Sequence, residues 1–183
     1  MDPLPATGRP LGEFWAEVRG VGREAFLAHY PDPILIELTV SPADALREFD
    51  TMVVEARGHI THAGADPDAG AGPASRIFSV RKCTSVFPGK ITVGRTTNND
   101  CIVREGRVSK LHAWFVREGE ITTLVDAESS NGTFVNGARL PKLGRVALKP
   151  RDQVAFGSQA RFVYVPAVQF FRRAPFLVKG PAK

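Results

Sequence analysis

The sequence DAESSNGTFVNG at residues 126–137 places the group Ser129-Ser130-Asn131-Gly132 directly before the β-prone run Thr133–Val135. Asn-Gly is the strongest short signal for a hairpin turn, because such turns need the positive φ that these residues tolerate. We therefore predict that the chain reverses at residues 129–132 and enters a strand immediately afterwards.

Similar strand signals continue on both sides of this turn, from residue 76 to residue 165. Each is a short run of β-branched and aromatic residues, and Gly, Asn, Pro or Asp stands in nearly every gap. Strands at this density, with no helix between them, favour a mainly β sandwich or barrel over a βαβ architecture. The runs are 76–82, 90–95, 101–103, 112–117, 121–125, 133–135, 145–148, 153–156 and 161–165.

The first 75 residues follow a different pattern. Apolar residues spaced by three and four predict an amphipathic helix over residues 11–25, which Gly20 and Gly22 weaken. The apolar run 34–40 predicts a strand or a buried connector, and Ser41-Pro42 predicts the start of a short helix to Phe49. Residues 51–60 are β-prone, whereas residues 61–75 are rich in Gly, Ala, Pro and Asp and predict a flexible loop.

These patterns divide the chain into three parts. We expect a partly helical extension at residues 1–50, a β-sandwich at 51–166 and a C-terminal tail at 167–183. The sandwich contains the loop 61–75 and a core motif region at 76–166. A length of 183 residues with 43% hydrophobic content suffices for one substantial core.

Charge is divided unevenly along the chain. Residues 1–75 hold 5 Lys or Arg against 12 Asp or Glu, whereas residues 76–183 hold 19 against 7, so their net charges are −7 and +12. A basic half attracts anions such as a phosphopeptide, a nucleic acid or an acidic protein. The first ten residues lack the cationic start and apolar run of a secretory signal, so we expect a cytoplasmic protein.

The sequence gives no sign of a metal, a cofactor or an enzyme. Cys83 and Cys101 stand far apart with no second ligand pair, so we expect reduced cysteines rather than a disulfide or a zinc site. Ser109 and His112 have the spacing of a nucleophilic pair. No oxyanion-hole motif such as G-x-S-x-G accompanies them, so we expect no catalysis.

Four polar segments lie at the expected strand ends, where the loops of a sandwich come together in space. In this group Arg95 offers a planar pair of donors, Ser109 a hydroxyl and Lys110 a point charge, which together suit a phosphate. The Asn131 carboxamide carries both a donor and an acceptor, as is needed to hold a peptide backbone beside that phosphate. The four segments are Gly94-Arg95, Asn98-Asn99-Asp100, Val108–Ala113 and Asp126–Gly137.

The order of these segments resembles the signature of forkhead-associated (FHA) domains. The signature runs GR, S-x-x-H and D-x-x-S-x-N-G-T-x-V-N-G, which this chain spells ITVGRTTNND, VSKLHAWF and DAESSNGTFVNG. The similarity covers residues 76–166, or begins near residue 51 if Thr51–Ile60 supplies the first strand. It implies a twisted sandwich of about eleven strands, carrying the N-terminal helical extension, whose apical loops bind phosphothreonine.

The resemblance also implies a role for each residue of the motif. Arg95, Ser109 and Lys110 would contact the phosphate, and Ser130 and Asn131 would contact the rest of the ligand. Supporting residues would be Gly94 by close packing, His112 by bracing the loop, Gly132 by its positive φ, and Asn136 and Gly137 by closing a hairpin. Glu128 departs from the pattern, because the family often has Gly or a small polar residue there.

Two functions remain open from the sequence. The first is a phosphothreonine-dependent interaction module or adaptor that recognises a protein phosphorylated by a separate Ser/Thr kinase. The alternative is an FHA-like scaffold that makes constitutive contacts with protein or nucleic acid, as the charge of residues 76–183 suggests. The acidic residues 1–50 could fold back on the phosphate site. The arrangement we expect instead is that their helix packs against the sandwich, against a partner or against a second copy of the chain.

Overall fold

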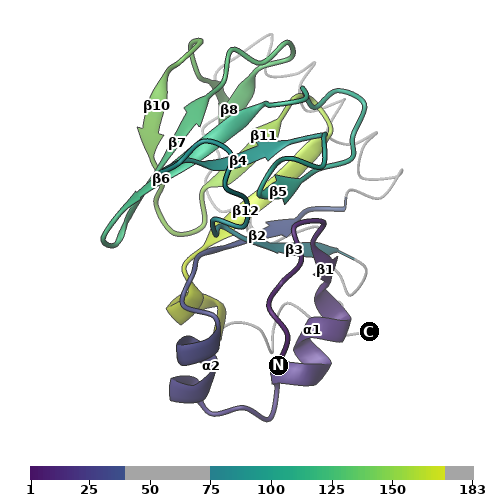
Figure 1. Ribbon diagram of the computed structural model, residues 1–183, viewed down its shortest axis with the longest axis vertical. Coiled ribbons are helices and arrows are strands. Elements are labelled where there is room, and N and C mark those ends of the chain that lie inside the picture. The colour runs from purple at the N-terminus through teal and green to yellow at the C-terminus, as the bar shows by residue number, and fades with distance from the viewer. Residues whose placement is uncertain (40–74, 172–183) are drawn as a thin grey trace, which may run out of the picture.

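Two β-sheets form the larger part of the molecule, and short helices cover one end of it (Figure 1). The computed structural model describes residues 1–39 and 75–171. One sheet has seven strands in the order β1-β3-β2-β12-β11-β8-β9, and the other has five in the order β10-β7-β6-β4-β5. The strands are β1 (Arg9–Pro10), β2 (Ile34–Glu37), β3 (Arg76–Ser79), β4 (Ile91–Gly94), β5 (Cys101–Ile102), β6 (Ala113–Glu118), β7 (Ile121–Asp126), β8 (Thr133–Val135), β9 (Ala138–Arg139), β10 (Arg145–Ala147), β11 (Gln153–Phe156) and β12 (Ala160–Val165).

The mainly β fold class is confirmed, with twelve strands among the described residues where about eleven were expected. Within the two sheets every pair of neighbouring strands is antiparallel except β4 and β5, which run parallel. Because β4 and β5 run in the same direction, the chain must return from the end of β4 to the start of β5. Residues 95–100 make this return, so they form a compact loop. No helix in the described part of the chain is long and apolar enough to cross a membrane.

The space between the sheets is filled by aromatic and aliphatic side chains from both. Phe115 and Leu124 project from the five-stranded sheet, and Phe156 and Phe162 project from the seven-stranded sheet into the same cluster. The Phe156 and Phe162 rings lie 5.6 Å apart, centroid to centroid. Burial of one such side chain stabilises the fold by roughly 1.5–3 kcal/mol, so this cluster is the main reason that the sheets stay together.

The expected N-terminal helix is divided into two. The helices α1 (Leu11–Val18) and α2 (Arg23–His29) are separated at the two glycines that weakened the sequence pattern. Gly22 has an extended backbone and forms the N-cap of α2, where its carbonyl accepts a hydrogen bond from the Phe26 N–H. Two short helices can turn their apolar residues towards one point, which a single straight helix of that length cannot do.

The two helices and the helical residues 167–171 pack against the outer face of the seven-stranded sheet, and together we call them the helical cap. Its centre is aromatic, because Phe14 contacts Phe26, Tyr30 and Phe170 at centroid distances of 6.4, 5.0 and 5.7 Å. The expected packing of the N-terminal helical region against the sandwich is therefore what the structure shows for residues 1–39.

Strand β2 explains why an apolar run begins at residue 34. It lies between β12 and β3, with Leu35 opposite both Tyr164 and Phe78. Ile34 and Ile36 face the helical cap, whereas Leu35 faces the core between the sheets, so the strand is buried on both faces. The expected extension at residues 1–50 thus supplies an interior strand of the sheet.

Several expectations fall outside the described residues. The short helix expected at 41–49, the β-prone segment 51–60, the domain boundary at residue 51 and all but the last residue of the loop 61–75 lie within residues 40–74. The last of these, Ser75, is buried, and its carbonyl accepts a hydrogen bond from the Leu11 N–H. Of the expected tail, only residues 167–171 are described.

Candidate functional site

Strand β4 ends at a close contact with the loop that precedes β6. A Cβ atom on Gly94 would lie 2.2 Å from the Lys110 carbonyl oxygen, so only glycine fits at this position. One residue later, the Arg95 N–H donates to the Ser109 carbonyl (3.0 Å). The Arg95 side chain is exposed, and no hydrogen bond or ion pair within the described residues involves its guanidinium.

Polar side chains in the loop 95–100 also bind the Lys110 carbonyl that Gly94 approaches. Asn99 is buried, and its Nδ2 donates to the Lys110 carbonyl (2.8 Å), as does the Thr96 hydroxyl (2.9 Å). The Lys110 backbone is therefore fixed by two donors, while its side chain is exposed. From the sequence, Asn98-Asn99-Asp100 are recognisable as a polar segment, and no role is expected for them. Their signal was the density of Asn and Asp in a turn.

Asp100 joins this loop to the segment that precedes β4. Its buried carboxylate accepts hydrogen bonds from the N–H groups of Cys83, Thr84 and Thr92 at 2.7–2.8 Å, and it pairs with Lys82 (2.8 Å). Burial alone would raise its pKa. The bond from Lys82 and those from the three backbone donors outweigh burial and lower the pKa to about 2.

His112 is fully buried behind the next loop and binds two segments at once. Its Nδ1 accepts a hydrogen bond from the Ser109 N–H (3.0 Å), so the ring proton is on Nε2, which donates to the Gly132 carbonyl (3.0 Å). The ring also packs edge-on against Phe156. Burial lowers the pKa of His112, which favours the neutral ring that this pair of bonds requires.

The turn after β7 meets the Ser109 loop directly. The Ser130 N–H donates to Ser109 Oγ (3.1 Å), and the Asn131 Nδ2 donates to the Arg107 carbonyl (2.7 Å). Ser130 and Asn131 are exposed, and Ser109 is half-buried. The structure therefore brings together Arg95, Ser109, Lys110, Ser130 and Asn131, which come from three loops linked to one another by hydrogen bonds.

A buried carboxylate organises this turn from below. Asp126 accepts hydrogen bonds from the Ser129 and Thr133 hydroxyls (both 2.6 Å) and from the Ser129 N–H (3.1 Å). Gly132 has a φ of +86°, as expected for the turn, and Glu128 has a φ of +57°. The left-handed conformation at Glu128 gives a physical reason why glycine would suit that position better.

Asn136 and Gly137 close the hairpin between β8 and β9, with φ values of +50° and +80°. The Asn136 side chain has a second contact, because its Oδ1 accepts from the Gln153 N–H (2.9 Å) and its Nδ2 donates to Asp152 (2.8 Å). These bonds connect the hairpin to the start of β11. The motif alone does not indicate this contact, because residues 152–153 lie outside it.

Comparisons with known proteins agree with the motif. The family model of the FHA domain matches residues 91–157, which include the ends of β4 and β7 and the loops described above. The oxoglutarate dehydrogenase inhibitor of Corynebacterium diphtheriae is 32% identical over 145 residues, covering 74% of this chain and 92% of that protein. The chain belongs to the FHA domain family.

Other similar proteins share less with this FHA domain. The ABC transporter ATP-binding/permease protein Rv1747 of Mycobacterium tuberculosis is 43% identical over 53 residues, which are 29% of this chain and 6% of that protein. The chain spans between 6% and 35% of the length of three such longer relatives. The yeast Dun1 FHA domain, solved with a doubly phosphorylated peptide, aligns with a TM-score of 0.46 and 21% identity over 73% of each chain.

FHA domains are protein-interaction modules rather than catalytic ones. The geometry at Ser109 agrees with this, because its hydroxyl is not bonded to His112. The backbone N–H of Ser109 occupies the histidine Nδ1, and the hydroxyl oxygen accepts from Ser130 instead. A histidine with both nitrogens engaged by backbone groups cannot act as a base for that hydroxyl.

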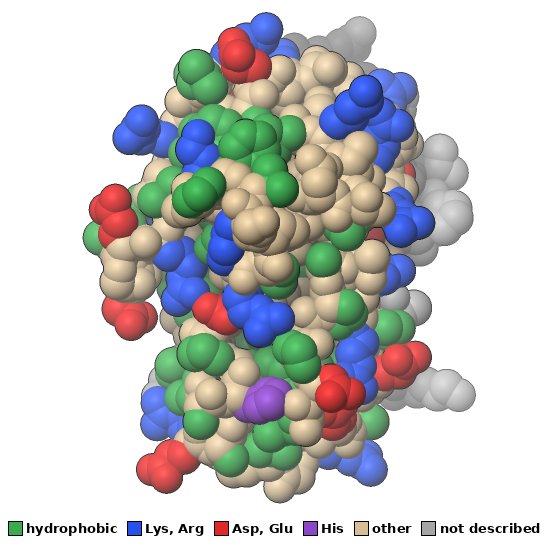
Figure 2. Space-filling view, in the orientation of Figure 1, with side chains coloured by type: hydrophobic (Ala, Val, Ile, Leu, Met, Phe, Trp, Pro, Cys, Tyr) green, Lys and Arg blue, Asp and Glu red, His purple; other side chains and the backbone are tan. Residues whose placement is uncertain are grey.

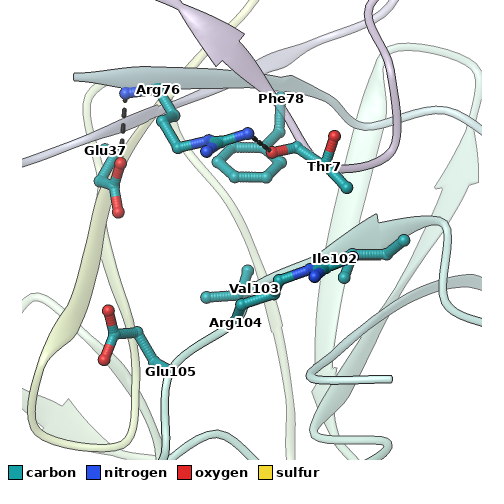
Figure 3. A pocket seen from close by; sticks show the side chains of 8 residues that line it. All are labelled: Thr7, Glu37, Arg76, Phe78, Ile102, Val103, Arg104 and Glu105. Carbon is teal, nitrogen blue, oxygen red and sulfur yellow. Dashed lines mark hydrogen bonds between the residues drawn. The ribbon is translucent and has the colours of Figure 1, made fainter. Parts of the chain in front are cut away.

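A pocket elsewhere in this FHA domain contains none of the expected site residues (Figure 3). It has a volume of about 390 Å³ and carries both signs of charge, with Arg76 and Arg104 near Glu37 and Glu105. Figure 3 shows the Arg76 side chain reaching across to the Thr7 carbonyl, while its backbone N–H donates to Glu37. These bonds connect the N-terminal segment to β3 and to the strand β2 beside it, so we interpret the pocket as part of the framework.

Proposed function

We propose that this FHA domain binds a protein segment phosphorylated on threonine and acts as an adaptor downstream of a Ser/Thr kinase. The observation that carries the proposal is the meeting of Arg95, Ser109 and Asn131 at one surface, on loops fixed by Gly94 and His112. The Corynebacterium relative and the family match support an interaction role for the domain.

The phosphate would lie between Arg95 and the Ser109 loop. The Arg95 guanidinium can donate two parallel hydrogen bonds, and the exposed Lys110 adds a second positive charge. Because Ser109 Oγ already accepts from the Ser130 N–H, its hydroxyl proton is directed away from that bond and can be donated to a phosphate oxygen. A few such charge-assisted bonds, each worth about 1.5–3 kcal/mol, would give a transient site of about micromolar affinity.

The peptide backbone would be held by Asn131. Its Nδ2 is already bonded to Arg107, which fixes the orientation of the carboxamide and leaves the Oδ1 to accept a peptide N–H. We extend the preference of the family for phosphothreonine over phosphoserine to this chain, because the additional methyl group would fill a small apolar notch between the loops. Both cysteines are free, Cys83 exposed and Cys101 buried, which suits a reducing compartment such as the cytoplasm.

The test is a titration with three peptides of one sequence, carrying phosphothreonine, phosphoserine or unmodified threonine. We expect the phosphothreonine peptide to bind most tightly, and Arg95→Ala to weaken it at least about tenfold, as the loss of a charge-assisted pair predicts. Arg19→Ala, at an exposed position after α1, is the matched control and should leave affinity unchanged. Equal binding of the phosphorylated and unmodified peptides would overturn the proposal.

A second candidate function is non-specific binding of a polyanion, which the net charge of residues 76–183 favours. Figure 2 shows Lys and Arg side chains scattered over the face in view, rather than gathered into one continuous stripe. A polyanion site would show a steep dependence on salt together with indifference to Arg95→Ala. Phosphate-dependent binding that is lost with Arg95 would exclude it.

A further inference from the structure

The turn that meets the Ser109 loop also forms one wall of a second pocket. Ser130 and Asn131 face the Ser109 loop, whereas Ser129 and Gly132 line a hollow of about 410 Å³ whose other wall runs from the end of β9 to Lys142. No residue of the loops 95–100 and 107–112 lines this hollow. A peptide that crosses the turn from the phosphate would therefore arrive at a separate surface.

The second wall of this pocket is held in place by backbone hydrogen bonds. The Leu140 N–H donates to the Thr133 carbonyl (2.8 Å), which anchors the segment to β8. Residues 141–144 form a tight turn closed by the Gly144 N–H and the Pro141 carbonyl (2.8 Å). The Asp126 N–H in turn donates to the Gly144 carbonyl (3.1 Å), so backbone hydrogen bonds connect both walls of the pocket.

Two cations project from this wall. The Arg139 side chain crosses Gly132 so closely that a Cβ atom there would lie 2.6 Å from the Arg139 Nε. Lys142 is at the exposed position after Pro141, and Leu140 with Pro141 supplies apolar surface between the two cations. Within the described residues, no hydrogen bond or ion pair involves the Arg139 or Lys142 side chain.

One carboxylate, that of Asp126, also lines this pocket. Asp126 is 2% exposed, and its two oxygens accept three hydrogen bonds from Ser129 and Thr133. Asp126 forms no ion pair with Arg139 or Lys142, so the lining holds two exposed positive charges against one buried carboxylate. The open part of the pocket is positively charged and suits an anion.

We propose that this pocket is a second anion subsite, in which Arg139 and Lys142 receive an acidic side chain of the same peptide that is held at Arg95 and Ser109. The inference rests on the proposed function. A tight turn is less than about 7 Å across and an extended peptide advances about 3.3 Å per residue, so the acidic residue should stand about two to four positions from the phosphothreonine.

The experiment is a scan with synthetic phosphothreonine peptides in an alanine background, each with one glutamate at a position from four before to four after the phosphothreonine. Affinities are measured for the wild-type chain, for the double variant Arg139→Gln/Lys142→Gln, and for the charge-matched control Arg19→Gln/Lys149→Gln at exposed positions that line neither pocket. A further peptide replaces the best-placed glutamate with phosphoserine, which separates a preference for carboxylate from one for phosphate.

We expect glutamate at one position, or at two positions on the same face of the peptide, to strengthen wild-type binding about threefold to tenfold, as two exposed ion pairs allow. The double variant should lose this gain but bind the all-alanine phosphopeptide normally, and the control should keep the gain. A gain that persists in the double variant, or no gain at any position, overturns the subsite while leaving phosphothreonine binding intact. Loss of phosphate dependence in the wild-type chain would instead refute the proposed function.

Discussion

The loops of the candidate site, residues 95–100, 107–112 and 127–132, and the helical cap are held by different kinds of interaction. In the loops, buried polar groups make directional bonds to specific backbone atoms, as His112 does to Ser109 and Gly132. In the cap, Phe14, Phe26 and Phe170 pack by shape and apolar contact alone. Directional bonds fix the positions of the candidate site atoms closely but tolerate little change, whereas apolar packing supplies most of the stability. The region that fixes the positions of the candidate site atoms is therefore distinct from the region whose apolar packing stabilises the fold.

The largest effect should come from removing Phe14, the centre of the cap. Phe14→Ala should lower the free energy of unfolding by about 3–5 kcal/mol, because it removes a fully buried ring and leaves a cavity. Affinity for the phosphothreonine peptide, measured well below the melting temperature, should stay at the wild-type value. Urea unfolding and peptide titration check the two halves of this expectation. A loss of peptide affinity in the folded variant would show that packing in the helical cap affects the loops of the candidate site.

Replacing His112 should lower both the free energy of unfolding and the peptide affinity, whereas replacing Phe14 should lower only the first. His112→Ala leaves the Ser109 N–H and the Gly132 carbonyl without a partner, and each buried unsatisfied group costs about 1–3 kcal/mol. We expect the free energy of unfolding to fall by about 2–4 kcal/mol, and peptide affinity to fall at least tenfold because both loops lose their support. Wild-type affinity in the folded variant would refute the bracing role.

The same histidine should give the unliganded protein a pH signature. Its folded pKa lies below the ordinary value of 6.5, so below that pH the unfolded state binds a proton that the folded state does not. Stability should therefore decline as pH falls from about 6.5 towards the folded pKa, by at most about 1.4 kcal/mol per pH unit. Chemical unfolding at several pH values should show this slope in the wild type and not in His112→Ala.

The smallest effect concerns Glu128, which is exposed and has a left-handed backbone. Glu128→Gly should raise the free energy of unfolding by about 0.5–1 kcal/mol, because glycine adopts this conformation without strain. It should also strengthen phosphopeptide binding about twofold by removing a negative charge near the site. Glu128→Gln separates the two effects, because it should raise affinity alone. Destabilisation by Glu128→Gly would contradict the expected strain.

That the candidate site residues lie on adjoining loops could be predicted from the sequence, because the signals for these loops are local. Gly94 ends a strand and Asn131 lies in a turn, and the order of such residues along the sequence resembled one family. Asp100 and Asn99 could not be assigned a role in the same way. Polar residues in a turn are usually solvated, and nothing in the sequence shows that these two are buried beneath the loop.

The position of β2 in the sheet could not be predicted from the sequence, for a different reason. Its apolar run is compatible with a strand or a buried connector, because burial on both faces removes the alternation that identifies a strand. Its partner β12 lies near the other end of the chain, and no local signal points to that pairing. The break between α1 and α2 was marked by Gly20 and Gly22, although the sequence pattern alone did not show that the two halves change direction.

The interior position of β2 has a consequence for how the protein is made. On the ribosome β2 emerges well before β12, which completes its hydrogen bonding and begins only at Ala160. Pairing between segments so far apart in sequence is slow, because a long loop must close before any contact forms. In the nascent chain, the edge of β2 that faces β12 therefore stays unpaired until residues 160–165 have been made, whereas β3 can pair with its other edge much earlier.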